Sequence, residues 1–186
     1  NLNTIFSLLM LQSSLPSNEK AESILKDAAN RIQSMIVLYD KIYRHDSFYS
    51  MNINDFLSYL INEIIRVLAP NQNYHLDLDI EPIELPVKIL SPLGIMVNEL
   101  LSNSIKYAFR ADSQLVISLK ISNKNNMIDL IYKDNGPGIP ENINSSNTSG
   151  LGLQLIDMLS RQIEADLKIS NHNGARFEIS FSPGKI

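Results

Sequence analysis

The strongest limit on the fold of this chain comes from two strand-like segments that follow each other closely. Residues 115–121 and 127–134 both alternate apolar and polar side chains, which is typical of a half-buried β-strand. The polar run "NKNN" is the expected turn between them. Strands joined by so short a turn pair antiparallel, so the sequence predicts a β-hairpin here.

Further helices and strands surround this hairpin. The spacing of apolar residues predicts helices over residues 54–68, 92–110 and 151–163, and strands over residues 74–80, 166–170 and 176–181. The runs "EPIELP" and "ENINSSNTSG" are expected to be loops. This mixture predicts an α+β fold, in which a mainly antiparallel sheet carries helices on one face of an α/β sandwich.

Residues 1–48 are predicted to form a helical hairpin. The run "NLNTIFSLLMLQ" is apolar on several sides of a helix, and after "SSLPS" apolar residues recur at helical spacing as far as Tyr43. Such a hairpin has too little core of its own, so we expect a homodimer in which two copies form a four-helix bundle. The alternative is that the hairpin packs on residues 49–186, the second predicted domain.

Composition excludes several classes of function. The net charge is −4 with acidic and basic residues mixed, so the chain lacks the basic footprint of a nucleic-acid-binding protein. Without cysteine it can form neither disulfides nor thiolate metal sites. No apolar run approaches the roughly 20 residues that span a bilayer. We therefore expect a cytoplasmic protein, linked to a membrane only through an N-terminal region absent from this sequence, if at all.

The predicted helix over residues 92–110 has two different sides. At about 100° per residue, one stripe holds Glu99, Asn103, Lys106 and Arg110, and the opposite side holds Val97, Leu101, Ile105 and Ala108. The apolar side is expected to pack on the sheet, while the polar stripe is either a solvated face or the wall of a site. Asn103 is a poor helix former in mid-helix, and Glu99 lies one turn before it, which favours a site.

Two glycine-rich segments follow this helix. In "DNGPGIP", Asp134 continues the inward-facing phase of its strand, so its carboxylate is expected to need a partner such as the exocyclic amine of a ligand. Gly136 and Gly138 would let that ligand approach the backbone. In "SGLGLQLI", Gly150 and Gly152 begin a helix, where free N–H groups and the helix dipole favour phosphate. The polar loop before them is long enough to be a mobile cover.

Together these segments resemble the ATP-binding domain that sensor histidine kinases share with gyrase, Hsp90 and the mismatch-repair ATPases. "NELLSNSIKYAF" is similar to the N box, "DNGPGIP" to the first glycine box and "GLGLQLI" to the second, and the similarity covers roughly residues 50–182. The N-terminal helices resemble the dimerisation region of the histidine kinase class whose phosphoacceptor segment reads His-x-x-Lys-Asn-Asn-Leu. The acceptor histidine is therefore expected a few residues before Asn1, and His45, His75 and His172 are expected to be surface residues.

The resemblance implies a role for each site residue. Asn103 would be the protein ligand of Mg²⁺, Asp134 would bond the adenine amino group of ATP, and Lys106 would neutralise phosphate charge. Tyr107 would line the nucleotide pocket or belong to the core. Glu99 would either polarise the nucleophile or only orient Asn103. The nucleotide contacts would come from Asn103, Lys106, Tyr107, Asp134, Gly136, Gly138, Ile139, Gly150, Leu151, Gly152 and Leu153.

The implied reaction is transfer of the γ-phosphoryl group of ATP to a histidine, and then to an aspartate in the receiver domain of a response regulator. The alternatives are a non-kinase ATPase of the same superfamily, an anti-sigma-type Ser/Thr kinase, and a dimeric scaffold with an inactive nucleotide site. One departure concerns Gly174-Ala175, because relatives often have Gly-Thr before the last strand. If that threonine contributes to the pocket, its absence weakens nucleotide binding.

Overall fold

The computed structural model describes residues 25, 28, 29, 32, 36, 50–70, 73–108, 114–140 and 151–184. Within the predicted N-terminal hairpin, the described positions are helical, and two of them, Ala29 and Ile36, are buried. The predicted dimer contacts and the domain boundary near residue 48 lie outside the described residues.

From residue 50 onward the chain forms two layers, a sheet and a set of helices. In chain order the elements are β1 (Ser50–Asn52), α3 (Ile53–Leu68), β2 (Tyr74–Ile80), β3 (Glu84–Pro86), α4 (Val87–Asn103), a π-helical turn η1 (Ser104–Ala108), β4 (Leu115–Lys124), β5 (Met127–Asp134), α5 (Leu151–Gln162), β6 (Asp166–Asn171) and β7 (Ala175–Phe181).

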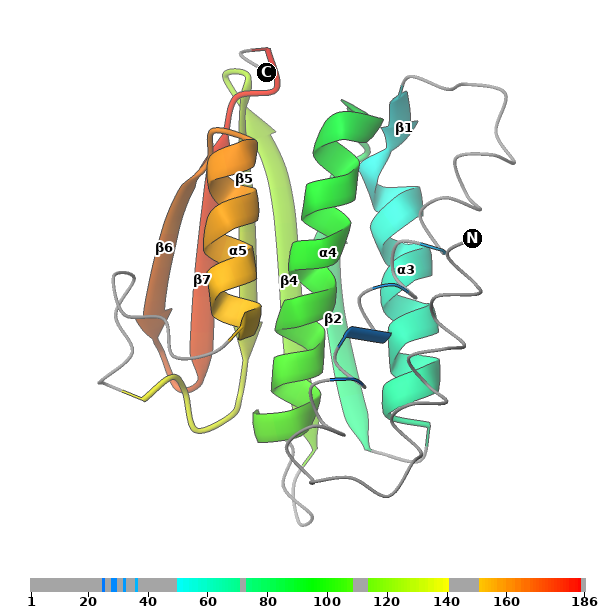
Figure 1. Ribbon diagram of the computed structural model, residues 1–186, viewed down its shortest axis with the longest axis vertical. Helices are drawn as coiled ribbons and strands as arrows, with labels where there is room; N and C mark the ends of the chain where they lie inside the picture. Colours follow the sequence, from blue (N-terminus) through cyan, green and yellow to red (C-terminus); the bar gives the residue numbers. More distant parts are fainter. Residues whose placement is uncertain are drawn as a thin grey trace.

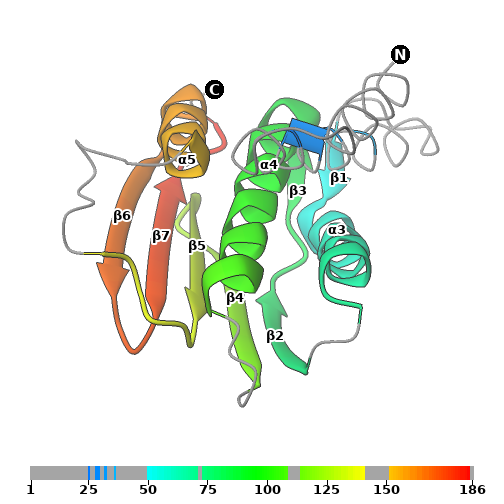
Figure 2. The same cartoon turned by 60° about the horizontal axis from the view of Figure 1, so that its bottom comes forward.

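Five of the strands form one sheet in the order β2-β4-β5-β7-β6. Strands β2 and β4 run parallel, whereas the other neighbouring pairs are antiparallel. Helices α3, α4 and α5 cover the same face of this sheet (Figure 1), which the rotated view confirms (Figure 2). The predicted fold class, α+β with a mainly antiparallel sheet and helices on one face, is confirmed.

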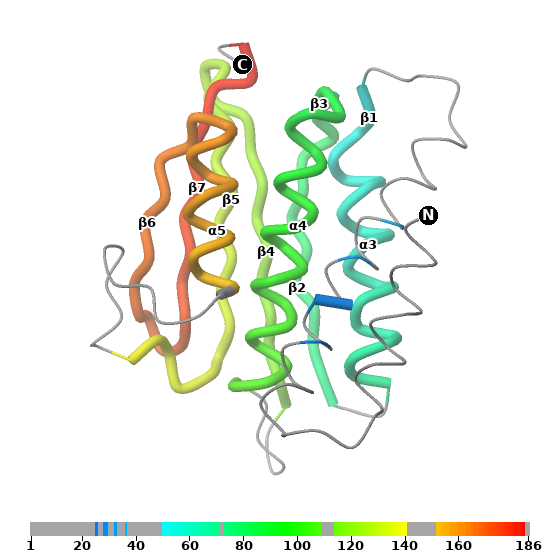
Figure 3. The backbone as a smooth tube through the Cα atoms, in the orientation of Figure 1, coloured from blue at the N-terminus to red at the C-terminus, as the bar shows by residue number. Residues whose placement is uncertain are grey.

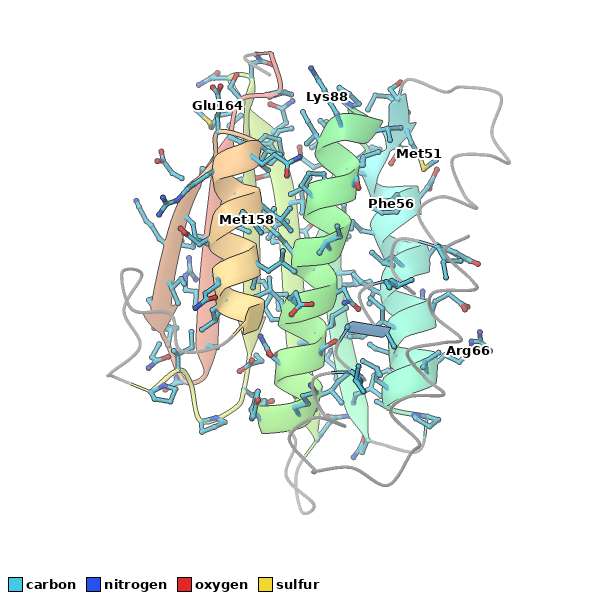
Figure 4. All side chains as sticks on the ribbon, viewed as in Figure 1. Met51, Phe56, Arg66, Lys88, Met158 and Glu164 are labelled. Carbon is cyan, nitrogen blue, oxygen red and sulfur yellow. The ribbon has the colours of Figure 1, made fainter. Side chains whose placement is uncertain are left out.

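The core fills the space between the sheet and these helices. Alternate residues of β5, namely Ile128, Leu130 and Tyr132, are buried, and β7 shows the same pattern from Ala175 to Phe181. Helix α4 also packs closely on α3, because a Cβ atom at Gly94 would lie 2.8 Å from Cζ of Phe56. Figure 4 labels Phe56 on the side of α3 that faces α4. Helix α4 is thereby held against both the sheet and α3.

The structure corrects three of the predicted boundaries. The run "EPIELP" is not only a loop, because β3 pairs antiparallel with β1 in a separate two-stranded sheet. Helix α4 begins at Val87 and contains Pro92. Pro92 lacks an N–H for the helix, but burial of Ile89 and Leu90 in the extra turn offsets that loss. The β4–β5 turn is reduced to Asn125 and Asn126, whose φ angles of 52° and 62° suit a two-residue hairpin.

Candidate functional site

The three predicted motifs meet at one end of the helix layer. Helix α4 runs into η1 at this end, α5 starts here, and the segment after β5 crosses here, at the lower end of the tube in Figure 3. A direct contact joins two of the motifs: a Cβ atom at Gly152 would lie 2.7 Å from Oε2 of Glu99 and 3.6 Å from Nδ2 of Asn103. The start of α5 therefore lies against the carboxylate and amide of α4.

Asp134 ends β5 and points toward the helix layer, as its phase predicted. Its Oδ2 accepts a hydrogen bond from the Ser104 hydroxyl at 2.6 Å. Its Oδ1 accepts from the backbone N–H groups of Gly136 at 2.9 Å and Ala175 at 3.0 Å. The partner that this carboxylate is expected to need is therefore supplied in part by the protein, through three donors, and a ligand amine would be a further donor.

Glycines around Asp134 allow segments of the protein to approach one another. At Gly136 a Cβ atom would lie 2.3 Å from Cβ of Ala108, at the end of η1. At Gly174, where φ is 139°, a Cβ atom would lie 1.9 Å from the carbonyl oxygen of Asp134. Neither position has room for a side chain, so these glycines are required for packing within the protein, whatever binds there.

A side chain that sequence reasoning missed holds the segment after Asp134. The Asn171 amide accepts a hydrogen bond from the N–H of Ile139 at 2.8 Å and donates one to its carbonyl at 2.8 Å. Gly138 precedes Ile139 and has a φ of 80°, and a Cβ atom added there would lie 2.7 Å from Oδ1 of Asn171. An asparagine at the end of a strand carries no distinctive sequence signal, since this residue type is common in turns.

The polar stripe of α4 is divided between the interior and the surface. Glu99 is only 5% exposed, so it does not belong to a solvated face. Asn103 is half-buried and Lys106 is exposed. Tyr107 is 70% exposed, which corrects the alternative that it belongs to the core. The physical reason is η1, whose wider turn changes the phase of the side chains after Asn103.

The remaining predicted site residues are either outside the described part of the structure or lie as follows. Arg110, Gly150, the polar loop of residues 141–150 and the side chain of Leu151 lie outside the described residues. Leu153 is half-buried and packs against the core. His75 and His172 are exposed, as predicted, and His45 lies outside the described residues. The backbone N–H of Ala175 donates a hydrogen bond to Oδ1 of Asp134, and this bond does not depend on the side chain at that position.

The donor groups near Gly152 suit a hard cation together with phosphate. Amide and carboxylate oxygens are ligands that Mg²⁺ accepts, and this ion usually completes its shell with water and phosphate oxygens. Within the described ranges, no group of three or more histidine and acidic side chains is arranged to hold a metal. A cation held by Asn103 would take its other oxygen ligands from phosphate and water. In the same part of the chain, no helix is long and apolar enough to cross a membrane.

Comparison with known families agrees with this geometry. Residues 90–185 match the family of histidine kinase-, DNA gyrase B- and HSP90-like ATPases. The chain belongs to this family. Residues 1–68 match a further family described as histidine kinase. Membership of the ATPase family implies ATP binding, and the histidine kinase match suggests kinase activity.

Individual relatives are histidine kinases. A sensor histidine kinase, PdtaS of Mycolicibacterium smegmatis, is 25% identical over 173 residues, which cover 86% of this chain and 32% of that protein. The chain thus spans about a third of the length of this curated relative. The histidine kinase domain of the Erythrobacter litoralis blue-light-activated kinase EL346 superposes with a TM-score of 0.78 at 20% identity, covering 100% of this chain and 87% of that one. The catalytic domain of histidine kinase ThkA gives a TM-score of 0.57 at 17% identity, covering 72% and 95%. At these identities the two structures show the shared fold.

Proposed function

We propose that this chain is the catalytic part of a two-component sensor histidine kinase. It binds Mg-ATP between α4, α5 and the segment after β5, and transfers the γ-phosphoryl group to a histidine and then to an aspartate of a response regulator. The observation that carries the proposal is the contact of Gly152 with Glu99 and Asn103, at the same end of the fold as Asp134. Support also comes from relatives that are themselves sensor histidine kinases.

Each motif has a separate task in nucleotide binding. Asp134 accepts a hydrogen bond from the adenine amino group, next to Gly136, Gly138 and Ile139. Gly150 and Gly152 admit the phosphates to the start of α5, where Leu151 and Leu153 flank them. The exposed Lys106 would offset the charge of the triphosphate, and the exposed Tyr107 would line the nucleotide pocket. Mg²⁺, held by Asn103, would supply further charge neutralisation when bound.

The transfer step is a displacement at the γ-phosphorus. An imidazole nitrogen of the acceptor histidine forms the P–N bond while the bond between the γ-phosphorus and the bridging oxygen of ADP breaks. The attacking nitrogen is the unprotonated one, so the proton that is lost comes from the other ring nitrogen and passes to a base. Glu99, beside Gly152, would either accept this proton or orient Asn103. The remaining residues position the groups and offset charge, which accounts for most of the catalysis in phosphoryl transfer.

The proposal extends to the domain arrangement and the partners. Residues 1–48 would form the dimerisation hairpin and bring the acceptor histidine of the pair within reach of residues 49–186. The second transfer requires a receiver domain of a response regulator with an accessible aspartate. The second copy of the chain and the response regulator would both act in the cytoplasm.

The proposed function can be tested by phosphorylation. The protein including the residues that precede Asn1 is incubated with Mg²⁺ and ATP labelled in its γ-phosphate. We expect acid-labile label on the protein that disappears when the upstream histidine is replaced by alanine, and that passes to a receiver domain. Acid-stable label would support the Ser/Thr kinase instead, and phosphate release without label would support the non-kinase ATPase. If ATP does not bind, the scaffold alternative is supported.

Replacing Gly152 by alanine tests the placement of Glu99. The new Cβ atom would lie 2.7 Å from Oε2 of Glu99, so the carboxylate must move. The obstacle is the end of a flexible side chain and alanine favours a helix, so we expect little change in Tm. We expect the rate of histidine phosphorylation to fall about tenfold to a hundredfold, because small misplacements at a reacting centre have effects of this size.

The matched control for Gly152→Ala is Met158→Ala, at an exposed position of the same helix (Figure 4). This control is expected to keep the wild-type rate. A normal phosphorylation rate in Gly152→Ala would show that the Glu99 carboxylate takes no part in the transfer.

A further inference from the structure

A chain of three side chains connects the interior of the sheet to the candidate adenine site. The Tyr132 hydroxyl donates a hydrogen bond to Oγ of Ser104 at 2.9 Å, and the Ser104 hydroxyl donates to Oδ2 of Asp134 at 2.6 Å. Ser104 and Tyr132 are buried. The Tyr132 ring is also fixed by an edge-to-face contact with Phe177, at a centroid distance of 6.4 Å.

The hydrogen bonds that link Tyr132, Ser104 and Asp134 allow only one consistent arrangement of their protons. A carboxylate only accepts hydrogen bonds, so the Ser104 hydroxyl must donate its proton to Asp134. Oγ of Ser104 can then only accept, so Tyr132 must donate to it. Burial raises the pKa of Tyr132 above its ordinary value, which keeps this phenol protonated and able to donate.

The remaining hydrogen-bonding capacity of Asp134 is small and of one kind. Oδ1 already accepts from the N–H groups of Gly136 and Ala175. Oδ2 accepts from Ser104 and, with about two acceptor positions on each carboxylate oxygen, has one position left. A ligand amino group can donate to it, whereas a ligand carbonyl oxygen in the same place would face a lone pair.

We propose that Ser104, supported by Tyr132, is a positioning residue that makes this site selective for a purine with an exocyclic amino group over one with a carbonyl in that place. The inference rests on the proposed function, since it assumes that ATP binds at Asp134. The Ser104 hydroxyl acts by occupying one position on Oδ2 and fixing the orientation of the carboxylate. Without it, the carboxylate can rotate or bind a water molecule that donates to a carbonyl, so the selectivity is lost.

The test compares two nucleotides that differ at this one group. Affinities for Mg-ATP and Mg-inosine triphosphate, which carries a carbonyl in place of the adenine amino group, are measured by titration calorimetry. The wild type is expected to prefer ATP by at least about tenfold, the value of one hydrogen bond to a charged group. In Ser104→Ala we expect this ratio to fall about tenfold, and in Tyr132→Phe to fall less, because the bond to Asp134 remains.

Two further variants separate selectivity from stability. Ser104→Ala leaves the buried Tyr132 hydroxyl without a partner and is expected to lower the Tm. The double variant Ser104→Ala/Tyr132→Phe removes that unpaired group, so it should regain Tm while the nucleotide ratio stays low. Ser102→Ala is the matched control, because Ser102 is buried on α4 and its Oγ has no hydrogen-bond partner among the residues that the structure describes. It should keep the wild-type ratio.

The outcomes distinguish this inference from the proposed function. If the wild type binds ATP and Ser104→Ala keeps the wild-type nucleotide ratio, the selectivity role of Ser104 is wrong and the proposed function stands. If the ratio follows Tm across the variants, including the double variant, Ser104 is structural and the inference is likewise overturned. If the wild type binds neither nucleotide, the proposed function fails and the inference fails with it.

Discussion

Replacing Asp134 by asparagine is expected to weaken ATP binding about a hundredfold. The amide removes the charge that strengthens the hydrogen bonds at this position, and it brings an N–H₂ group among three protein donors, those of Ser104, Gly136 and Ala175. If the side-chain oxygen of the new asparagine keeps the hydrogen bonds from the two backbone N–H groups, the N–H₂ group of that asparagine faces the ligand amine. One lost charged bond and one donor–donor contact each contribute about tenfold.

Titration calorimetry with Mg-ATP measures this effect, and Asp166→Asn is the matched control. Asp166 is exposed at the start of the edge strand β6, so the same charge is removed away from the site. We expect the control to bind as the wild type does. An unchanged dissociation constant in Asp134→Asn, with a folded protein by circular dichroism, would remove the adenine role of this residue and with it the proposed orientation of the nucleotide.

Replacing Gly174 by alanine is expected to destabilise the domain by about 3 kcal/mol or more. At this glycine φ is 139°, which side chains rarely allow, and a Cβ atom would lie 1.9 Å from the backbone oxygen of Asp134. Unlike a flexible side chain, that backbone cannot move without disturbing the end of β5. ATP binding should weaken as well, because the neighbouring Ala175 N–H bonds Asp134.

Urea unfolding measures the stability effect, and Gly184→Ala is its control. At Gly184 the nearest atom to an added Cβ is 3.5 Å away, which is an ordinary contact. The control should unfold at the wild-type midpoint. Equal midpoints for Gly174→Ala and Gly184→Ala would mean that the turn between β6 and β7 does not pack against the backbone of Asp134.

Most of the main strands and helices could be predicted because each has one buried face, whereas α4 is buried on all sides from Pro92 to Ser102. The period of two in β5 also predicted which way Asp134 points. Strands β1 and β3 have three residues each, too few to show a period. The start of α4 was misplaced because a proline usually lies in the first turn of a helix, whereas Pro92 lies beyond it.

The partners of the site residues could not be predicted in the same way. Ser104 and Ala175 approach Asp134 from segments far away in the sequence, and only the packing of α4 and the pairing of β5 with β7 bring them together. The π-helical turn that exposes Tyr107 has no periodic signal in the sequence. Asn171 has none either, since its role depends on where Ile139 lies after folding.

The parallel pairing of β2 with β4 has a consequence for the order of folding. A parallel pair cannot close through a tight turn, so the chain must cross over the sheet between these strands, and α4 lies in that crossover. We expect β2 to join the sheet only when α4 has docked, while the local β4–β5 hairpin forms early. The helix that carries Glu99 and Asn103 would then gain its native position in the same late event that adds the edge strand, and nucleotide binding would appear at the end of refolding.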